Sequence, residues 1–531
     1  MFDLLIKGGR IVDGSGGPSW TGDVGIRDGK ITALGSLEAS NAKEAIDAKG
    51  LAVSPGFIDP HTHTDLSFML DPAAQSKVRQ GVTLEVTGNC GISMCAPLIG
   101  GMQEFLKDRL ESYGAKLEID WVTFAEWLDR LDQCGKTVNL ATLVGHNTVR
   151  GAVMGYDDRG PTPDELDAMR HLVAESLDAG ALGFSSGMYY TPGCYARADE
   201  VMELAKEAAR RGKVYPTHIR DESDFSVGLF MAFQEAIEIG RQSGARVEIA
   251  HTKCGGPSVW GKADKLLEMV ERARKEGVDV ACDQYPYDRA SSTLSATVFP
   301  RWAQVGGRDE TLKKLKEGAF RKRVAEFIEE VIPHRTGVEG ILIASFPPDR
   351  SLEGRTLGQL AREWEESPSE TALRLFEQYD PFCVLSQMQE ADVETIAASP
   401  WVSVGSDGSS LSRTGPLSEG KPHPRNYGTF PRFLARYVRE KRLVSLEEGV
   451  RKMTSLPASR FGLTRRGRLA PGYYADVVVF DPATVQDRGT FEDPHQYPAG
   501  IPHVIVNGVS VIKDGEFTGK TPGKVLRDFG D

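Results

Sequence analysis

Residues 56–63 read GFIDPHTH, a short apolar run followed directly by a pair of histidines. The apolar part is typical of a buried strand, and its polar continuation marks the strand's carboxyl end. In an extended segment residues i and i+2 point to the same face, so His61 and His63 can converge on one metal ion. Two solvated loop histidines are the alternative for an isolated pair, so the rest of the chain decides between them.

Similar short apolar runs recur along the middle of the chain, and helical stretches separate most of them. The clearest helix begins after Thr162, with Pro163 in its first position and Glu165 three residues after the cap. Repeated strand–helix alternation predicts an α/β fold with a parallel sheet, and eight strands favour a closed (β/α)8 TIM-like barrel. An open doubly wound sheet remains the alternative. The predicted strands are 56–58, 82–86, 138–144, 181–184, 214–217, 247–250, 278–282 and 401–404.

Both ends of the chain show short β segments with hairpin turns, at residues 27–30 and at Asn507-Gly508. They predict a small β-sandwich domain formed from residues 1–55 and 465–531 together, with the barrel spanning 56–464. Residues 285–350 carry additional helix and strand, which we interpret as an insertion after the seventh barrel strand. The apolar run 382–386 has no assigned place in the barrel.

The composition excludes several classes of protein. Among 531 residues, 63 Lys and Arg face 75 Asp and Glu, a net charge of -12. No basic excess exists to bind nucleic acid or an anionic membrane. The sequence contains no apolar run near the ~20 residues of a membrane span and no visible signal peptide. Seven cysteines, an odd number, do not suggest a disulfide framework, so we expect a cytoplasmic protein.

Chemically active side chains follow several predicted strands. Cys90 follows the second strand within GNCG (residues 88–91), His218 follows the fifth and His251 the sixth. Most cysteines are inert packing residues and most such histidines are hydrogen-bonded core residues, but their joint position at strand ends is hard to explain by packing. One cysteine and two histidines fill three positions around zinc and leave one for water, the arrangement of a catalytic centre.

Asp407 follows the eighth strand within GSDG (residues 405–408). A turn or helix-cap aspartate is the alternative at such a position. Zinc lowers the pKa of a water molecule from 15.7 towards ~7, and a neighbouring carboxylate can then act as general base and proton donor. Asp407 is therefore a candidate catalytic residue.

The ordered set of these motifs resembles the amidohydrolase superfamily, and more closely the D-aminoacylase (N-acyl-D-amino-acid deacylase) family. The resemblance covers nearly the whole chain and includes the stretches 56–65, 88–91, 217–220, 250–253 and 405–408. Hydantoinases and dihydroorotases of the superfamily use a carboxylated lysine after the fourth strand. Here residues 183–187 read GFSSG, without a lysine, which counts against a ring-opening hydrolase.

The resemblance implies roles for individual residues. It implies that one firmly bound zinc ion is held by Cys90, His218 and His251, with His61 and His63 at a weaker second metal position and Asp407 as the catalytic aspartate.

The same resemblance implies substrate contacts from Tyr190, Lys253, Tyr285 and Ser292, since a carboxylate needs a cation or several hydroxyl donors. For the tyrosines, packing in the wall of the site is the alternative.

The predicted function is zinc-dependent hydrolysis of the amide bond of N-acyl-D-amino acids, releasing a carboxylate and a free D-amino acid. The expected partner is this small-molecule substrate, with no nucleic acid and no membrane. A dipeptidase or cyclic-amide hydrolase is the alternative, and a metal-free, non-catalytic barrel is a third hypothesis. The D configuration rests on the resemblance alone, and the preferred side chain stays open.

Overall fold

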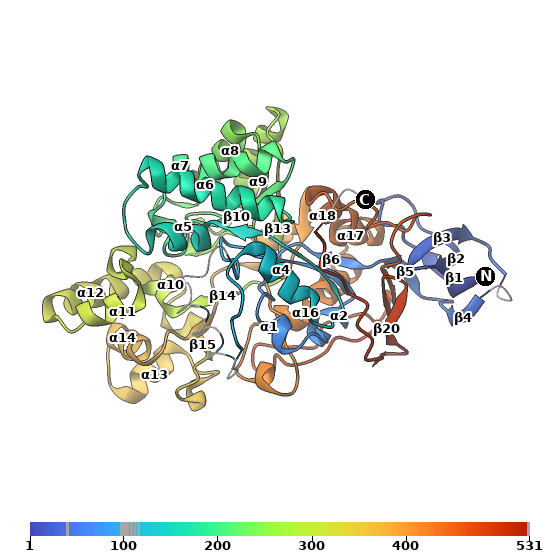
Figure 1. The fold of residues 1–531 in the computed structure, drawn as a ribbon. Helices are drawn as coiled ribbons and strands as arrows, with labels where there is room; N and C mark the ends of the chain where they lie inside the picture. Colours follow the sequence, from blue (N-terminus) through green and yellow to red (C-terminus); the bar gives the residue numbers. More distant parts are fainter. Residues whose placement is uncertain (39–41, 96–105, 107–109, 111–112, 114–116, 528–531) are drawn as a thin grey trace.

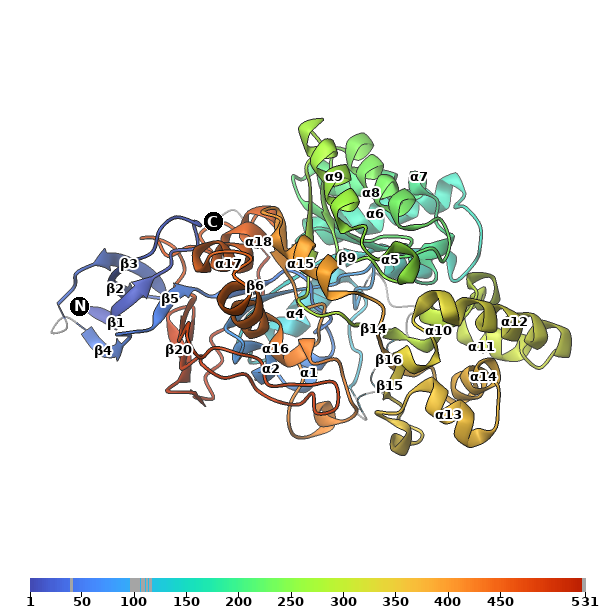
Figure 2. The same ribbon diagram turned by 180° about the vertical axis from the view of Figure 1, so that it is seen from behind.

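The structure is a computed structural model that describes residues 1–38, 42–95, 106, 110, 113 and 117–527. The molecule is elongated (Figures 1 and 2). The end formed by β1 (Phe2–Ile11) to β5 (Ala52–Pro55) and the end formed by α10 (Leu294–Val298) to α14 (Pro368–Gln378) lie on opposite sides of a central barrel. The expected strands are present in the described residues, and each lies within about three residues of its predicted position.

The central strands form two parallel sheets, ordered β6-β7-β8 and β9-β10-β11-β12-β13-β17. Only Leu143 separates β8 from β9, so the two sheets are continuous on that side. On the other side, the backbone N–H of Asp407 donates to the His61 carbonyl at 2.8 Å, and that of His63 donates to the Gly408 carbonyl at 2.9 Å. The predicted TIM-like barrel is therefore confirmed, and these two bonds link the segments that follow β6 and β17 at the carboxyl ends of the strands. Its strands are β6 (Phe57–Asp59), β7 (Val82–Thr87), β8 (Asn139–Thr142), β9 (Val144–Gly145), β10 (Phe184–Gly187), β11 (Val214–His218), β12 (Arg246–Ile249), β13 (Val280–Gln284) and β17 (Val402–Val404).

Helices alternate with these strands and cover the outside of the barrel (Figure 1). The predicted helix is α6 (Pro163–Asp178), and its predicted cap is present. The Thr162 hydroxyl accepts from the Glu165 N–H, and the Glu165 carboxylate accepts from the Thr162 N–H. Within the described residues, no helix is both long and apolar enough to cross a bilayer. The other main helices here are α4 (Phe124–Asp132), α5 (His146–Met154), α7 (Ala198–Arg210), α8 (Leu229–Ser243), α9 (Ala263–Lys275), α15 (Glu390–Ala398), α16 (Arg425–Arg432), α17 (Leu446–Met453) and α18 (Ser455–Arg460).

Strands from both ends of the chain share one nine-stranded sheet. The two ends meet where Val478 pairs with Ser54 in antiparallel register, and both predicted hairpin turns connect neighbouring strands. This shared sheet supports the proposed division into 1–55 with 465–531 and 56–464. Its strands are β1 (Phe2–Ile11), β2 (Trp20–Arg27), β3 (Lys30–Gly35), β4 (Ala42–Asp47), β5 (Ala52–Pro55), β18 (Val477–Phe480), β19 (His503–Val506), β20 (Val509–Lys513) and β21 (Glu516–Phe517).

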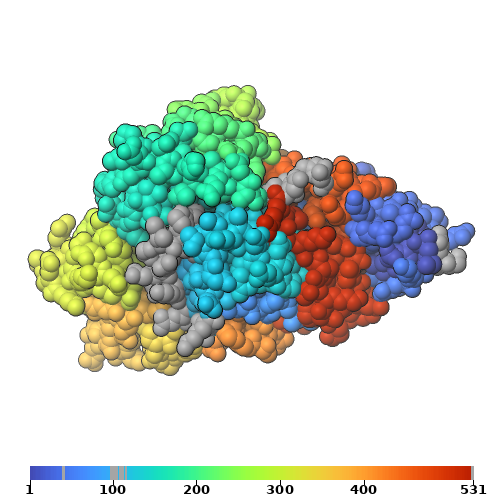
Figure 3. Space-filling model, viewed as in Figure 1, coloured from blue at the N-terminus to red at the C-terminus, as the bar shows by residue number. Residues whose placement is uncertain are grey.

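A separate group of elements follows the seventh barrel strand, β13, and forms the other end of the molecule (yellow to light orange in Figure 3). Its small sheet has the order β14-β16-β15, so the unassigned run at 382–386 is its central strand. The group therefore extends to Leu385, past the predicted end of the insertion at residue 350. The prediction was too short because the sequence of a four-residue apolar run does not show which sheet it joins. Its elements are β14 (Ala290–Thr293), α10 (Leu294–Val298), α11 (Gly307–Lys314), α12 (Gly318–Arg335), β15 (Ile341–Ser345), α13 (Leu357–Trp364), α14 (Pro368–Gln378) and β16 (Phe382–Leu385).

Candidate active site

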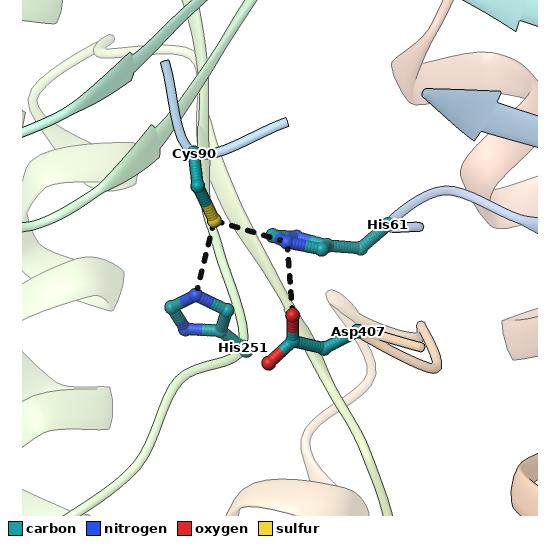
Figure 4. A group of neighbouring side chains, drawn as sticks. All are labelled: His61, Cys90, His251 and Asp407. Atoms are coloured by element: carbon teal, nitrogen blue, oxygen red, sulfur yellow. Dashed lines mark hydrogen bonds and ion pairs between the residues drawn. The ribbon is translucent and has the colours of Figure 1, made fainter. Parts of the chain in front are cut away.

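Four predicted site residues converge at the carboxyl ends of the barrel strands (Figure 4). The Cys90 Sγ lies 3.3 Å from the Nε2 of His61 and 3.5 Å from the Nε2 of His251. The Asp407 Oδ1 lies 3.5 Å from the same His61 nitrogen. All four side chains are buried, and their ligand atoms lie within 4.8 Å of one another. The ends of β6, β7, β12 and β17 therefore meet at one centre.

The two remaining predicted ligands border this centre. The Nε2 of His63 lies 3.2 Å from the Asp407 Oδ1, and the ring centroid of His218 is 4.3 Å from that of His251. Neither ring nitrogen of His218 has a hydrogen-bond partner among the described residues, although both are buried. Buried polar atoms without a partner are uncommon and call for a ligand. Together with the cysteine and histidine donors, one of these nitrogens fits a zinc ion.

The backbone is unusual at three of these residues. Cys90, His251 and Asp407 have φ values of 55°, 34° and 49°, in the left-handed region. Residues other than glycine rarely adopt such angles, and they persist only where the surroundings hold them in place. The fold thus holds a strained backbone at the cysteine, one histidine and the aspartate of the centre.

The glycines around Cys90 allow its loop to pack closely. Gly88 and Gly91 have φ values of 76° and 74°. A Cβ atom on Gly88 would come within 2.2 Å of the Leu143 carbonyl oxygen, and one on Gly91 within 2.2 Å of the Asn147 Oδ1. The GNCG stretch is therefore required by backbone packing as well as by the chemistry of its cysteine.

We expect Gly91→Ala to lower the metal content and activity of the protein, because the added methyl group forces the Cys90 loop away from Asn147. Gly244→Ala is the matched control. It also places alanine at a positive φ, of 74°, but nothing lies within 4 Å of its Cβ position. Metal analysis and thermal unfolding of both variants separate the effect of the steric clash at Gly91 from the backbone strain that alanine causes at a positive φ. Wild-type metal content in Gly91→Ala would show that this packing does not hold the centre.

The electrostatics favour anionic forms of the cysteine and the aspartate. Burial disfavours the thiolate of Cys90, but the positive rings of His61 and His63 outweigh burial and hold the pKa of the thiol well below its usual range. Burial also opposes ionisation of Asp407, and the Arg425 guanidinium, 2.8 Å from its Oδ2, holds the pKa of that carboxyl well below its usual range. A thiolate is the metal-binding form of cysteine, and an ionised carboxylate can accept a proton.

Two acidic residues that sequence reasoning missed face the histidines. The Glu222 Oε1 lies 3.1 Å from the Nδ1 of His251 and 3.6 Å from the Nε2 of His218. The Asp283 Oδ1 accepts a hydrogen bond from the backbone N–H of His251 at 2.9 Å, and its Oδ2 lies 3.4 Å from the ring Nδ1 of His61. Carboxylates in such positions orient metal-binding imidazoles. Asp283 lies within β13 near its carboxyl end. The rule that functional residues of a barrel lie at the carboxyl ends of its strands (the strand-end rule) pointed to Cys90, and it also applies to Asp283.

The four predicted substrate-binding residues take different places. Tyr190 and Ser292 line the cavity, and their hydroxyl oxygens are 3.5 Å apart. The Lys253 Nζ forms an ion pair with Glu222 and lies 2.8 Å from the His251 Nδ1, so it faces the histidines. The hydroxyl of Tyr285 is buried without a hydrogen-bond partner among the described residues.

A cavity of about 700 Å³ lies over the centre, and its wall includes His63, Cys90, Asp407 and Arg425. It continues towards residues that follow β13, including Arg301. Its size is that of a site for a small molecule. Arg425, the third residue that sequence reasoning missed, also stacks on Tyr285, with 4.8 Å between its guanidinium carbon and the ring centroid.

Comparisons with known proteins agree with the family that the sequence motifs predict. The sequence profile of the Amidohydrolase family matches residues 44–215 and 392–512. The D-aminoacylase of Alcaligenes xylosoxydans xylosoxydans is 38% identical over 525 residues, 99% of this chain and 97% of that protein. The N-acyl-D-glutamate deacylase of the same organism is 38% identical over 531 residues, 99% of this chain and 96% of that protein. The solved structure of N-acyl-D-glutamate deacylase from Bordetella bronchiseptica, complexed with zinc and a phosphonate inhibitor, matches with a TM-score of 0.83 and 36% identity, covering 99% of this chain and 100% of that chain.

Proposed function

Since the chain belongs to the amidohydrolase family, within its D-aminoacylase group, and is thus a metal-dependent amide hydrolase, we propose that it deacylates N-acyl-D-amino acids. The products are a carboxylate and a free D-amino acid. The observation that carries this proposal is the convergence of Cys90, His61, His251 and Asp407 beside a small-molecule cavity.

Zinc is the proposed metal, and Cys90, His218 and His251 are its proposed firm ligands. His61 and His63 provide a second, weaker position, for which their contacts with Cys90 and Asp407 give support. When bound, zinc polarises the amide carbonyl and makes water acidic enough to ionise near neutral pH.

Asp407 is the proposed general base and acid. Its low pKa keeps the carboxylate ionised at neutral pH, and it lies beside both metal positions and the cavity. Asp407 accepts a proton from the attacking water and transfers it to the nitrogen of the departing amine. The C–N bond of the amide breaks, a C–O bond forms, and the carboxylate is regenerated.

Substrate binding is assigned to groups in and behind the cavity wall. The Arg425 guanidinium and the hydroxyls of Tyr190 and Ser292 are donors that suit the carboxylate and carbonyl of an N-acyl amino acid. Lys253 and Tyr285 stay predicted substrate residues. The Lys253 ammonium is paired with Glu222, and the Tyr285 ring contacts both Lys253 and Arg425. A substrate carboxylate would therefore compete with Glu222 for the positive charge of Lys253.

The D configuration of the substrate is proposed from the similar proteins, which are named D-aminoacylase and N-acyl-D-glutamate deacylase. A cytoplasmic location is also proposed. All seven cysteines are unpaired, and a reducing compartment keeps the Cys90 thiol available for metal.

A substrate panel tests the reaction. We expect the zinc-loaded protein to release free amine and carboxylate in equal amounts from N-acetyl-D-amino acids, measured by amine derivatisation and chromatography. Several side chains in the panel give the preference among them. Faster hydrolysis of a hydantoin, a dihydroorotate or a dipeptide than of every N-acetyl-D-amino acid would favour the alternative amide hydrolases and contradict the proposal.

A further inference from the structure

One fully buried lysine lies directly beneath the candidate active site. Lys77 belongs to the short helix α2 (Gln75–Val78), and its side chain has an exposed fraction of 0%. Its Nζ donates to the Asp59 Oδ2 at 2.9 Å, the Ser406 Oγ at 2.7 Å and the Gly408 carbonyl oxygen at 3.3 Å. A buried ammonium is costly unless it is paired and hydrogen-bonded, and these acceptors match its three donor hydrogens.

Two of the three acceptors are the residues on either side of Asp407. The same segment is fixed further by the Asp59 Oδ1, which accepts from the Ser406 N–H at 2.9 Å. The Ser406 Oγ accepts from the Gly408 N–H at 3.0 Å. The pair Asp59–Lys77 therefore holds residues 406–408 at their backbone and at the Ser406 hydroxyl.

Asp407 itself needs such support. Its φ of 49° lies in the left-handed region, which an aspartate keeps only when its surroundings hold it there. Its own backbone N–H donates to the His61 carbonyl, so the same segment also links the ends of β6 and β17. Lys77 contacts none of the proposed metal ligands by hydrogen bond or ion pair among the described residues.

We propose that Lys77 is the positioning residue of Asp407, acting through Ser406 and Gly408. This inference rests on the general base role proposed for Asp407. Removing the ammonium lets the Asp407 carboxylate move relative to the reacting atoms, and a displacement of about 1 Å can lower a rate about 100-fold. Metal binding and substrate binding use other residues, so they stay at the wild-type level.

The test compares two buried lysines. Lys77→Met keeps the length of the side chain and removes its donors. Lys452→Met is the matched control, because Lys452 is also 0% exposed but donates to the Ser399 carbonyl, away from the site. Measured quantities are kcat, KM, bound zinc and the free energy of unfolding. We expect kcat of Lys77→Met to fall about 100-fold with unchanged KM and zinc, and kcat of Lys452→Met to equal that of wild type.

Equal kcat in Lys77→Met and wild type would overturn the inference, and so would loss of zinc or an equal fall in both variants. If Lys77→Met does not fold, Ser406→Ala replaces it, since this variant removes the buried hydroxyl through which Lys77 is linked to the Gly408 N–H and the His61 carbonyl. A lower kcat at constant KM supports the inference, and an unchanged kcat overturns it. Activity retained by Asp407→Asn would instead show that the proposed role of Asp407 itself is wrong.

Discussion

We expect Asp407→Asn to lower kcat by a factor of about 100 to 10,000, the usual contribution of general acid–base catalysis. The amide has the shape of the carboxylate but cannot accept the proton of the attacking water. Bound zinc stays near the wild-type level, because Cys90, His218 and His251 are its proposed firm ligands. The measurement is kcat at saturating substrate together with metal analysis of the same preparation.

Asp392→Asn is the control for this substitution. Asp392 is also a buried aspartate, at 4% exposure, but its carboxylate accepts from the N–H groups of Gly261 and Ala263 outside the site. We expect its kcat to equal that of wild type. Turnover in Asp407→Asn that matches wild type, with Asp392→Asn also active, would refute the catalytic role of Asp407.

We expect Cys90→Ser to weaken zinc binding strongly. A serine hydroxyl is not ionised at neutral pH, whereas the Cys90 thiol has a pKa well below its usual range and is ready to bind zinc as a thiolate. Loss of residues that merely orient ligands lowers metal affinity by about 10- to 100-fold, so loss of a ligand should exceed that range. Zinc titration monitored by activity and by metal content measures the change.

Cys383→Ser provides the comparison. Cys383 is a fully buried cysteine in β16, and its Sγ contacts the Pro381 carbonyl at 3.7 Å. This variant should bind zinc as wild type does, even if its free energy of unfolding falls. Wild-type zinc affinity in Cys90→Ser would exclude Cys90 as a ligand.

Local sequence patterns predicted most of the framework. Apolar runs located the barrel strands, and a cap sequence located α6. The strand-end rule pointed to His61, Cys90, His251 and Asp407 because a parallel barrel brings all its carboxyl ends to one face. Each of these predictions depends on residues close together in the chain.

Contacts between distant segments were beyond such reasoning. Lys77 reaches Ser406 across 329 positions, and its residue type alone gives no sign of burial. Glu222 lies in a loop after β11 and Arg425 is the first residue of α16, and the chain path between each of them and its partner depends on the whole fold. Their contacts with His251 and Asp407 therefore appear only in three dimensions. The extent of the elements after β13 was missed for the same reason, because β16 joins its sheet through partners distant in the chain.

The most direct test of the central claim is the hydrolysis rate of one N-acetyl amino acid in both configurations, measured on metal-free and zinc-loaded protein. We predict that zinc-loaded protein hydrolyses the D enantiomer, that the L enantiomer reacts far more slowly, and that removal of zinc abolishes both reactions. Hydrolysis of the L enantiomer at an equal or higher rate, or undiminished hydrolysis by metal-free protein, would contradict the account.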